Sequence, residues 1–252
     1  GELIFTTSRI ITSSSRINVD FEYSDRKYGR NFFSAGTDGS LLDSKLKYSI
    51  QYIQEGDDKD NPIDFSLTEA DNEILKNAGG DRAKAVKPGA RLADADSTGR
   101  RNGFYELRDT IVRGEALQYY LYNPGSFNAI YNVSFSYSGF GIGDYSRESI
   151  GKFKFVGKGQ GVYSPIIYLP LPEKRKSGNV LVEYQPLPYL KFKAEIAGGD
   201  LNKNQFSTLD GSTVEGYARN FEVVFNPTKF SLFDLNLNSL TLKYRERYVE
   251  EG

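Results

Sequence analysis

The sequence predicts an all-β fold, an antiparallel meander of about ten strands. The main observation is that apolar and polar residues alternate along several stretches, which is the period of strands with one apolar and one wet face. The second is composition, because aromatic residues make up 14% of the 252 residues although the hydrophobic fraction is only 38%. The third is that most connections are too short for the crossovers that parallel strands require.

The clearest predicted strand covers 45–52, where Leu46, Tyr48, Ile50 and Tyr52 alternate with polar residues. Similar patterns predict strands over 3–5, 17–23, 119–121, 131–137, 180–184, 190–196, 221–225 and 240–245. The stretch 163–172 contains three prolines, so it is expected to be a connector or an edge strand.

Residues 57–110 have a different texture and are predicted to be a loop and helix insertion within a single β domain of residues 1–252. Ser66 and Glu69 have the spacing of a capping box, and Gly79 follows apolar residues at helical intervals. This pattern predicts one helix of about three turns. The charged stretch 81–103 shows no alternation and predicts a long surface loop.

A glycine-rich pattern occurs twice, in 135–146 and 153–164, with the second copy 18 residues after the first. Each copy contains two aromatic residues, three alternate glycines and a closing Tyr-Ser. The spacing is Gly-x-Gly-x-Gly, and no helix is expected after it, which argues against a phosphate-binding loop. We interpret the copies as two neighbouring strands whose glycines share one face and make room for aromatic rings.

The composition excludes several functions. The chain contains neither Cys nor His, so disulfides, thiolate metal sites, Ser-His-Asp triads and the usual zinc sites are impossible. A net charge of −1 gives no electrostatic reason to expect a nucleic-acid partner. We therefore predict a non-enzymatic protein with no catalytic residue, no cofactor and no assigned metal ligand. A carboxylate-dependent glycosidase is a distant alternative, because its paired acids cannot be located from sequence.

The chain lacks Met and begins with Gly1-Glu2, so we expect a processed chain or a fragment of a larger one. No run of about 18 apolar residues is present, and no transmembrane helix is expected. A transmembrane β-strand needs only alternation over about ten residues.

Three acidic segments resemble parts of calcium-binding loops. Asp94 and Asp96 match the first half of an EF-type loop, but position twelve is not a glutamate. Asp58 and Asp60 precede Glu69 at the right distance, but Pro62 lies between Asp60 and Glu69. The third segment contains Asp200, Asn202 and Asn204 and lacks the loop glycine. Turn residues without an ion are the alternative for all three segments.

The alternating strands fit two architectures. In a β-sandwich the apolar faces of two sheets form a core, whereas in an outer-membrane barrel they face lipid and the polar faces line a wet interior. Strongly polar wet faces, aromatic residues near strand ends and a long helix-bearing excursion favour the barrel, or part of one. The prolines of 163–172 and the shortness of several strands also suit a secreted sandwich that binds glycan or calcium.

Several runs carry a resemblance to known proteins. The segments 139–145, 156–165, 169–172 and 200–207 are similar to segments of large outer-surface proteins of Bacteroidota and Ignavibacteria-type bacteria. The runs 1–6 and 17–23 resemble strand pairs of the giant barrel translocon of type IX secretion and gliding.

The resemblance implies a β-barrel region in the bacterial outer membrane, at the cell surface. It implies membrane lipid as a partner, other outer-membrane or secretion proteins as further partners, and a role in protein secretion or gliding. It implies no catalytic residue.

Overall fold

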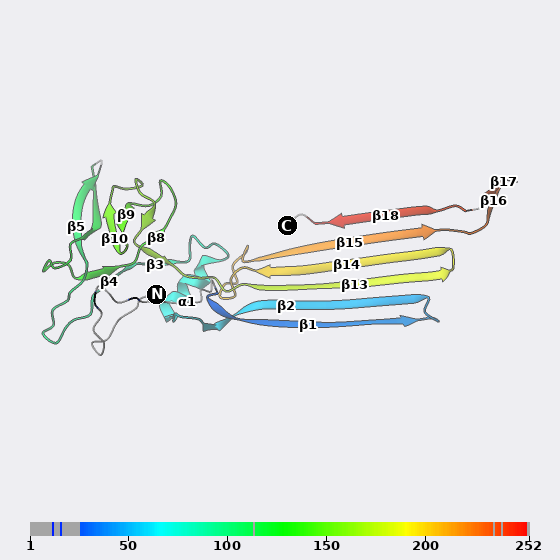
Figure 1. The fold of residues 1–252 in the computed structure, drawn as a ribbon, viewed down its shortest axis with the longest axis horizontal. Helices are drawn as coiled ribbons and strands as arrows, with labels where there is room; N and C mark the ends of the chain where they lie inside the picture. The colour runs from blue at the N-terminus through cyan, green and yellow to red at the C-terminus, as the bar shows by residue number, and fades with distance from the viewer. Residues whose placement is uncertain are drawn as a thin grey trace.

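The computed structural model describes residues 12, 16, 26–112, 114–233, 235–237 and 239–250 (Figure 1). The strands expected over 3–5 and 17–23 lie outside these residues. The described residues form 18 strands and one α-helix, and the paired strands among them are antiparallel. The all-β, antiparallel prediction is confirmed. The strand count is higher than predicted because many of the added strands are only two to five residues long, too short to produce alternation.

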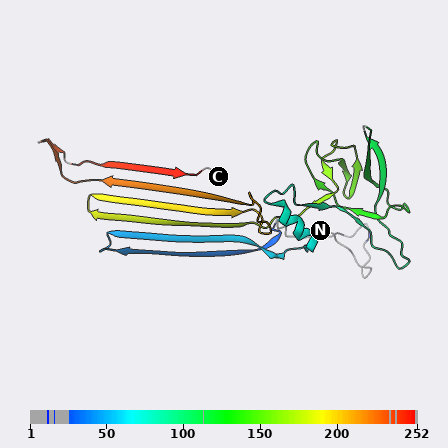
Figure 2. The same cartoon turned by 180° about the vertical axis from the view of Figure 1, so that it is seen from behind.

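A six-stranded sheet dominates the structure and extends away from the rest of the chain as a single layer (Figures 1 and 2). Among the described strands the sheet is open and does not close into a barrel, because β1 and β18 form its two edges. Its strands in spatial order are β1 (Tyr28–Leu41), β2 (Leu46–Pro62), β13 (Lys174–Leu187), β14 (Leu190–Asn202), β15 (Thr213–Phe225) and β18 (Leu242–Val249).

Two of the three connections at the far end of this sheet are short, whereas the connection from β15 to β18 spans residues 226–241 (Figure 1). Leu42, Asp43 and Ser44 have positive φ angles of 56°, 52° and 67°, which allow β1 to reverse directly into β2. Pro186 and Pro188 lie where β13 turns into β14, between the strands expected over 180–184 and 190–196. A small hairpin connects β15 to β18 and consists of β16 (Phe230–Leu232) and β17 (Leu235–Leu237).

At the other end of the sheet the chain between β2 and β13 forms a second part, residues 63–173, which we call the head (Figure 1). Of the residues 57–110 expected as an insertion, 57–62 belong to β2 and 105–110 to a strand of the head. The head contains α1 (Glu69–Ala78), β3 (Val86–Pro88), β4 (Ala90–Leu92), β5 (Tyr105–Val112), β6 (Glu115–Tyr122), β7 (Tyr131–Val133), β8 (Ser136–Tyr137), β9 (Tyr145–Ser149), β10 (Lys152–Phe155), β11 (Tyr163–Ser164) and β12 (Ile166–Tyr168).

These strands form two four-stranded sheets, in the orders β4-β7-β5-β6 and β10-β9-β11-β8. The strand β12 pairs only with β3, so this part of the stretch 163–172 is an edge strand, as predicted. The same stretch begins with β11, which pairs with both β9 and β8 inside its sheet, so the prediction is wrong for Tyr163 and Ser164. The stretch 81–103, expected to be a loop, also contains the short strands β3 and β4.

The predicted helix is confirmed, but its cap differs. Thr68 is the N-cap: its hydroxyl accepts the Asp71 N–H at 3.2 Å, and the Asp71 carboxylate accepts the Thr68 N–H at 3.0 Å. The capping box is therefore Thr68 and Asp71 rather than Ser66 and Glu69. The apolar side of the helix packs in a small core through Leu75, with Ala78, Ala85 and Leu169 also buried there.

The two copies of the glycine repeat have the same backbone conformation. Gly139 and Gly157 have φ angles of 108° and 114°, and Gly141 and Gly159, two residues on, have 74° and 66°. These left-handed values place both pairs in turns, where glycine is preferred. The interpretation of each copy as one strand with all its glycines on one face is therefore wrong, because alternation assumes extended φ.

The third glycine of each copy lies where the copies meet. Gly143 and Gly161 form an antiparallel bridge, and the Gly161 N–H donates to the Gly143 carbonyl at 2.8 Å. A Cβ on either would collide with the backbone of Tyr163 or Tyr145. The glycines thus make room for neighbouring backbone rather than for aromatic rings. The copies are nevertheless neighbours, as predicted, because Tyr145 pairs with Tyr163.

Aromatic side chains fill the space between the two sheets of the head. Tyr105 and Tyr145 are each 2% exposed, and the rings of Phe135 and Phe153 stack with centroids 4.4 Å apart. The Tyr145 hydroxyl accepts the Tyr120 N–H at 2.7 Å, which ties one sheet to the other. Burial raises the pKa of Tyr145 well above its ordinary value. The glycine repeat therefore belongs to the packing of this core.

Candidate functional site

The most unusual feature of the described chain is a large sheet with one apolar face and no covering layer. Residues directly opposite each other on antiparallel strands project to the same face, so the strand register assigns each side chain. The apolar face carries Phe33, Ala35, Thr37, Gly39 and Leu41 of β1, Leu46, Tyr48, Ile50 and Tyr52 of β2, Gly178, Val180, Val182 and Tyr184 of β13, Phe192, Ala194, Ile196 and Gly198 of β14, Tyr217, Phe221, Val223 and Phe225 of β15, and Leu242, Tyr244 and Tyr248 of β18.

The side chains of this face are open to solvent. Ile50 and Val180 in its centre are each 43% exposed, and Ile196 beside them is 53% exposed. Figures 1 and 2 show the sheet from opposite sides, and no described element lies across its far half in either view. Contiguous exposed apolar surface of this kind marks an interaction site in a soluble or membrane protein.

Aromatic pairs lie at both ends of the apolar face. Toward the head, the ring centroids of Phe33 and Tyr52 are 6.2 Å apart. Toward the turns, those of Tyr184 and Phe192 are 6.4 Å apart. From Phe33 to Leu41 the apolar face spans eight residue steps of β1, which corresponds to about 26 Å of strand. Most of the aliphatic side chains lie between the two aromatic ends.

The opposite face is polar and contains a row of alternating charges, which we call the charge ladder. The register places Lys47 opposite Glu183, Glu183 opposite Lys193, Lys193 opposite Glu222, and Glu222 opposite Arg245. The ladder crosses five adjacent strands. Sequence reasoning predicted strands with one polar face but could not find the ladder, because the ladder exists only once the register is known.

Ion pairs within and beside the ladder stabilise the charged forms of its acids. Lys191 lies 2.9 Å and Lys193 3.5 Å from the Glu183 carboxylate, and they hold the pKa of Glu183 below its ordinary value. Lys243 lies 2.9 Å from Glu222 and lowers the pKa of that carboxyl in the same way.

One charged pair lies within the apolar face, and a second, Lys176 and Asp200, lies at its head end in the row of Phe33. Arg219 and Glu246, the first pair, project from β15 and β18, with the guanidinium 3.0 Å from the carboxylate. Arg219 also lies 5.5 Å from the ring centroid of Tyr248. Both charged side chains are about half exposed. The pair interrupts an apolar face that is otherwise uncharged between its two aromatic ends.

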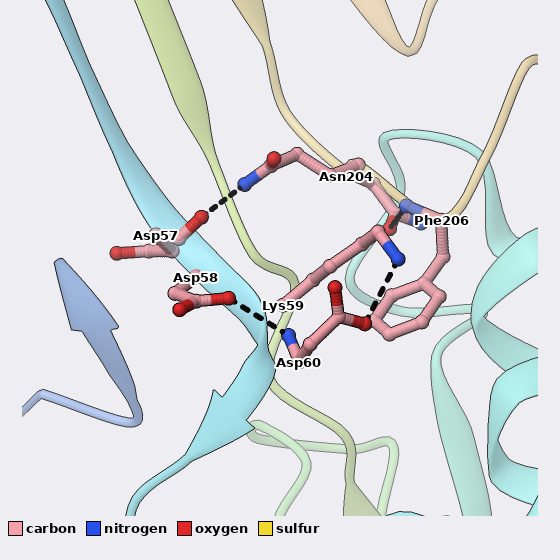
Figure 3. Close-up of polar contacts among 7 residues, drawn as sticks. Asp57, Asp58, Lys59, Asp60, Asn204 and Phe206 are labelled. Atoms are coloured by element: carbon pink, nitrogen blue, oxygen red, sulfur yellow. Dashed lines mark hydrogen bonds and ion pairs between the residues drawn. The ribbon is translucent and has the colours of Figure 1, made fainter. Parts of the chain in front are cut away.

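A polar junction holds the head against the sheet (Figure 3). The Gln205 side-chain amide donates to the Asp57 carbonyl at 2.6 Å and to the Glu173 carbonyl at 3.2 Å. The Asp57 N–H donates to the Glu173 carbonyl at 2.8 Å, and the Asp57 carboxylate accepts the Glu173 N–H at 2.9 Å. The buried Tyr28 hydroxyl donates to the Pro170 carbonyl at 2.8 Å. Burial, together with the charge of Asp57, raises the pKa of Tyr28 to about 12.

The segment with Asp200, Asn202 and Asn204, which in sequence resembles part of a calcium-binding loop, lies at this junction. Asn204 is fully buried, and its amide donates to the carbonyls of Leu75 and Gly79 at 2.7 Å each. Its side-chain oxygen accepts the Phe206 N–H at 3.0 Å. Asn202 accepts the Asn204 N–H at 2.9 Å. Asn204 therefore caps the C-terminus of α1, and its polar atoms have partners within the protein.

The other two candidate calcium segments also form local turns. One Asp96 oxygen accepts the Thr98 N–H at 2.8 Å, the Thr98 hydroxyl at 2.6 Å and the Arg100 N–H at 3.0 Å. The Asp58 carboxylate accepts the Asp60 N–H at 3.2 Å, and Asp60 pairs with Lys59 at 3.0 Å (Figure 3). Glu69 begins α1 and Asp94 lies in the irregular stretch after β4. No group of three or more acidic residues able to hold a metal ion occurs within the described chain.

Comparison with protein-family models, with curated proteins and with solved structures finds no match for the chain. No helix in the described part of the chain is long and apolar enough to span a membrane. The basis for a function is therefore the six-stranded sheet with its two contrasting faces.

Proposed function

We propose that this chain forms part of the wall of a bacterial outer-membrane β-barrel, without enzymatic activity. In this proposal the apolar face of the six-stranded sheet contacts lipid, and the polar face with its charge ladder lines an aqueous interior. Such a wall would serve a cell-surface protein of secretion or gliding, as the sequence resemblance implies.

The observation that carries the proposal is the length and composition of the apolar face. On β1 it runs from Phe33 to Leu41, nine residues, and a tilted transmembrane strand needs about 9–11 residues to cross the bilayer. Aromatic residues at both ends correspond to the girdles found at the two lipid-water interfaces. A glycine- and serine-containing polar face on the other side suits a water-filled interior.

Energetics support the same assignment. Fully burying a Val, Leu or Ile side chain stabilises a protein by about 1.5–3 kcal/mol relative to leaving it in water. Ile50, Val180 and Ile196 are roughly half exposed, so the uncovered sheet forfeits much of this stabilisation in water. Contact with lipid would recover it without any further protein layer.

The connections suggest how the sheet would be oriented. Outer-membrane barrels have short turns on the periplasmic side and longer loops on the outside. The turn between β1 and β2 and that between β13 and β14 are short and lie at one end, whereas the head of residues 63–173 lies at the other. The head would therefore project from the cell surface.

The competing architecture is a secreted β-sandwich in which a second sheet covers the apolar face. The two architectures place the same side chains in different surroundings, lipid in one case and protein in the other. Because the chain contains no cysteine, single cysteines with an environment-sensitive fluorophore can distinguish them.

The experiment compares neighbouring positions on opposite faces. The variants Ile50→Cys and Val180→Cys report on the apolar face, and Ser49→Cys and Asn179→Cys are their matched controls on the polar face. After refolding into vesicles that contain nitroxide-labelled lipids, we expect strong quenching at the first two positions and little at the controls.

Two results would count against the proposal. One is a soluble monomer that melts cooperatively without detergent. The other is equal quenching on both faces in vesicles. A fluorophore on the apolar face that is shielded from water but not quenched by lipid would favour the sandwich instead.

A further inference from the structure

The β18 edge of the six-stranded sheet has an unbalanced charge. The polar face of β18 carries Lys243, Arg245 and Arg247, whereas the facing positions on β15 are Val224, Glu222 and Asn220. Three cations therefore face one acid. Within the described chain the Arg247 guanidinium forms no ion pair, and Arg245 donates to the Asn220 side chain at 3.0 Å.

The charge ladder is incomplete at the same edge. Glu183, Lys193 and Glu222 each have a residue of opposite charge on both neighbouring strands, whereas Arg245 has one only on β15. All eight residues of β18 are exposed, and its outer side has no described partner strand. The backbone donors and acceptors of that side can therefore accept another strand.

The apolar face gives an independent indication at the same place. The ion pair of Arg219 and Glu246 lies on the two strands nearest this edge. Arginine on the lipid side of a barrel is unfavourable, so this part of the apolar face suits contact with polar protein groups better than contact with lipid. The Tyr244 hydroxyl lies 3.5 Å from the Glu246 carboxylate and extends the polar area.

We infer that the β18 edge is an interaction surface for an antiparallel β-strand with an acidic polar face, supplied by protein outside residues 1–252. Carboxylates opposite Arg245 and Arg247 would continue the charge ladder to a sixth strand. Polar side chains on its other face would contact Glu246. This inference rests on register and charge, and it holds whether or not the sheet lies in a membrane.

Charge also disfavours the other available partners. A second copy that pairs through its own β18 would place three cations against three cations. A second copy that pairs through β1 would offer one acid, Asp38, on the polar side of that edge between Ser34 and Ser40.

Charged side chains on an edge strand can also serve to prevent pairing. A binding experiment distinguishes the two roles. The full chain, folded in detergent micelles, is titrated with a fluorescent ten-residue peptide of alternating apolar and Glu residues. Control peptides carry Gln or Lys in place of Glu. Each cross-strand ion pair contributes modestly, so we expect the Glu peptide to bind about tenfold more tightly than the Gln peptide, and the Lys peptide least tightly.

Charge reversal provides the specific test. The double variant Arg245→Glu with Arg247→Glu should prefer the Lys peptide over the Glu peptide. The milder pair Arg245→Gln with Arg247→Gln should bind the Glu and Gln peptides equally, which keeps the test valid if the reversed variant does not fold. Arg175→Glu changes a cation on the polar face of an interior strand and should leave the preference for the Glu peptide unchanged.

Cross-linking tests the register. With a single cysteine in the peptide, a disulfide should form with Tyr244→Cys or with Tyr248→Cys, but not equally with both. Equal affinity for the Glu and Gln peptides, absence of binding, equal cross-linking at both positions, or a dimer formed through β18 would each overturn the inference.

Discussion

Asn204 should be one of the most sensitive polar residues of this chain. Its side chain is fully buried and connects the loop between β14 and β15 to the C-terminus of α1. Replacing Asn204 by Ala removes the donors to the Leu75 and Gly79 carbonyls and the acceptor for the Phe206 N–H. Gly79 is the C-cap of α1, and the last carbonyls of a helix have no partner within the helix. The Gly79 carbonyl and the Phe206 N–H would therefore lose their partners, and the Leu75 carbonyl would lose one of its donors.

Each buried group left without a partner costs about 1–3 kcal/mol. We therefore expect Asn204→Ala to destabilise the junction by about 2–4 kcal/mol, allowing for partial solvation of one carbonyl. Asn204→Asp should be at least as damaging, because a carboxylate would face two carbonyl oxygens. Asn202→Ala is the matched control: it removes one hydrogen bond, to the Asn204 N–H, and should cost about 1 kcal/mol.

Hydrogen exchange of the α1 amides measures this effect locally, and urea unfolding measures it for the whole chain. Exchange should accelerate in α1 for Asn204→Ala much more than for Asn202→Ala. Calcium should not change the unfolding midpoint of the unmodified protein if Asn204 acts as a cap. A loss below about 0.5 kcal/mol for Asn204→Ala, smaller than a typical hydrogen bond, would refute the reasoning, and calcium-dependent stabilisation would restore the ion-site alternative.

Three further predictions concern the head and the sheet. Burial raises the pKa of Glu106, but hydrogen bonds from Arg108 and its other neighbours hold it below its ordinary value. The contribution of Glu106 to stability should be complete above its unfolded pKa of about 4.3 and be lost as the pH falls through the lower folded value, and Glu106→Gln should remove this part of the acid sensitivity in unfolding curves. Gly161→Ala should lower the free energy of unfolding by more than 2 kcal/mol, roughly the range of core overpacking, because the new Cβ would collide with backbone. At Gly151 a Cβ meets nothing within 4 Å, so Gly151→Ala should cost about 1 kcal/mol, for the positive φ alone. Similar melting temperatures for the two variants would contradict this prediction. Ile50→Arg should reduce insertion into vesicles by about 2–4 kcal/mol, and Ser49→Arg should not, as judged by the fraction protected from protease.

The long strands and the helix could be predicted from the sequence because their signals are local. Leu46, Tyr48, Ile50 and Tyr52 recur every second residue, the period of a strand, and Leu75 and Ala78 lie at helical spacing. These patterns depend on neighbours within a few residues. They established one wet and one apolar face for the sheet before its strand order was known.

The remaining features depend on contacts between distant residues. Asn204 matched an oxygen-ligand spacing in sequence, but its partners are more than 120 residues away. The glycines of the repeat alternate in sequence, yet their φ angles are set by the turns they occupy. The charge ladder and the pair of Arg219 and Glu246 require the register of five strands, which no local pattern specifies.

The charge ladder also bears on how the sheet selects its alignment. Shifting one strand by two residues past its neighbour leaves every apolar side chain on the apolar face, so polarity alone cannot reject such a slip. Tight turns fix the alignment within the β1–β2 and β13–β14 hairpins, but β2 and β13 are joined only through the whole head. There a slip would separate Lys47 from Glu183 and Arg175 from Glu55. The alternating charges thus favour the native register between β2 and β13, which no tight turn fixes.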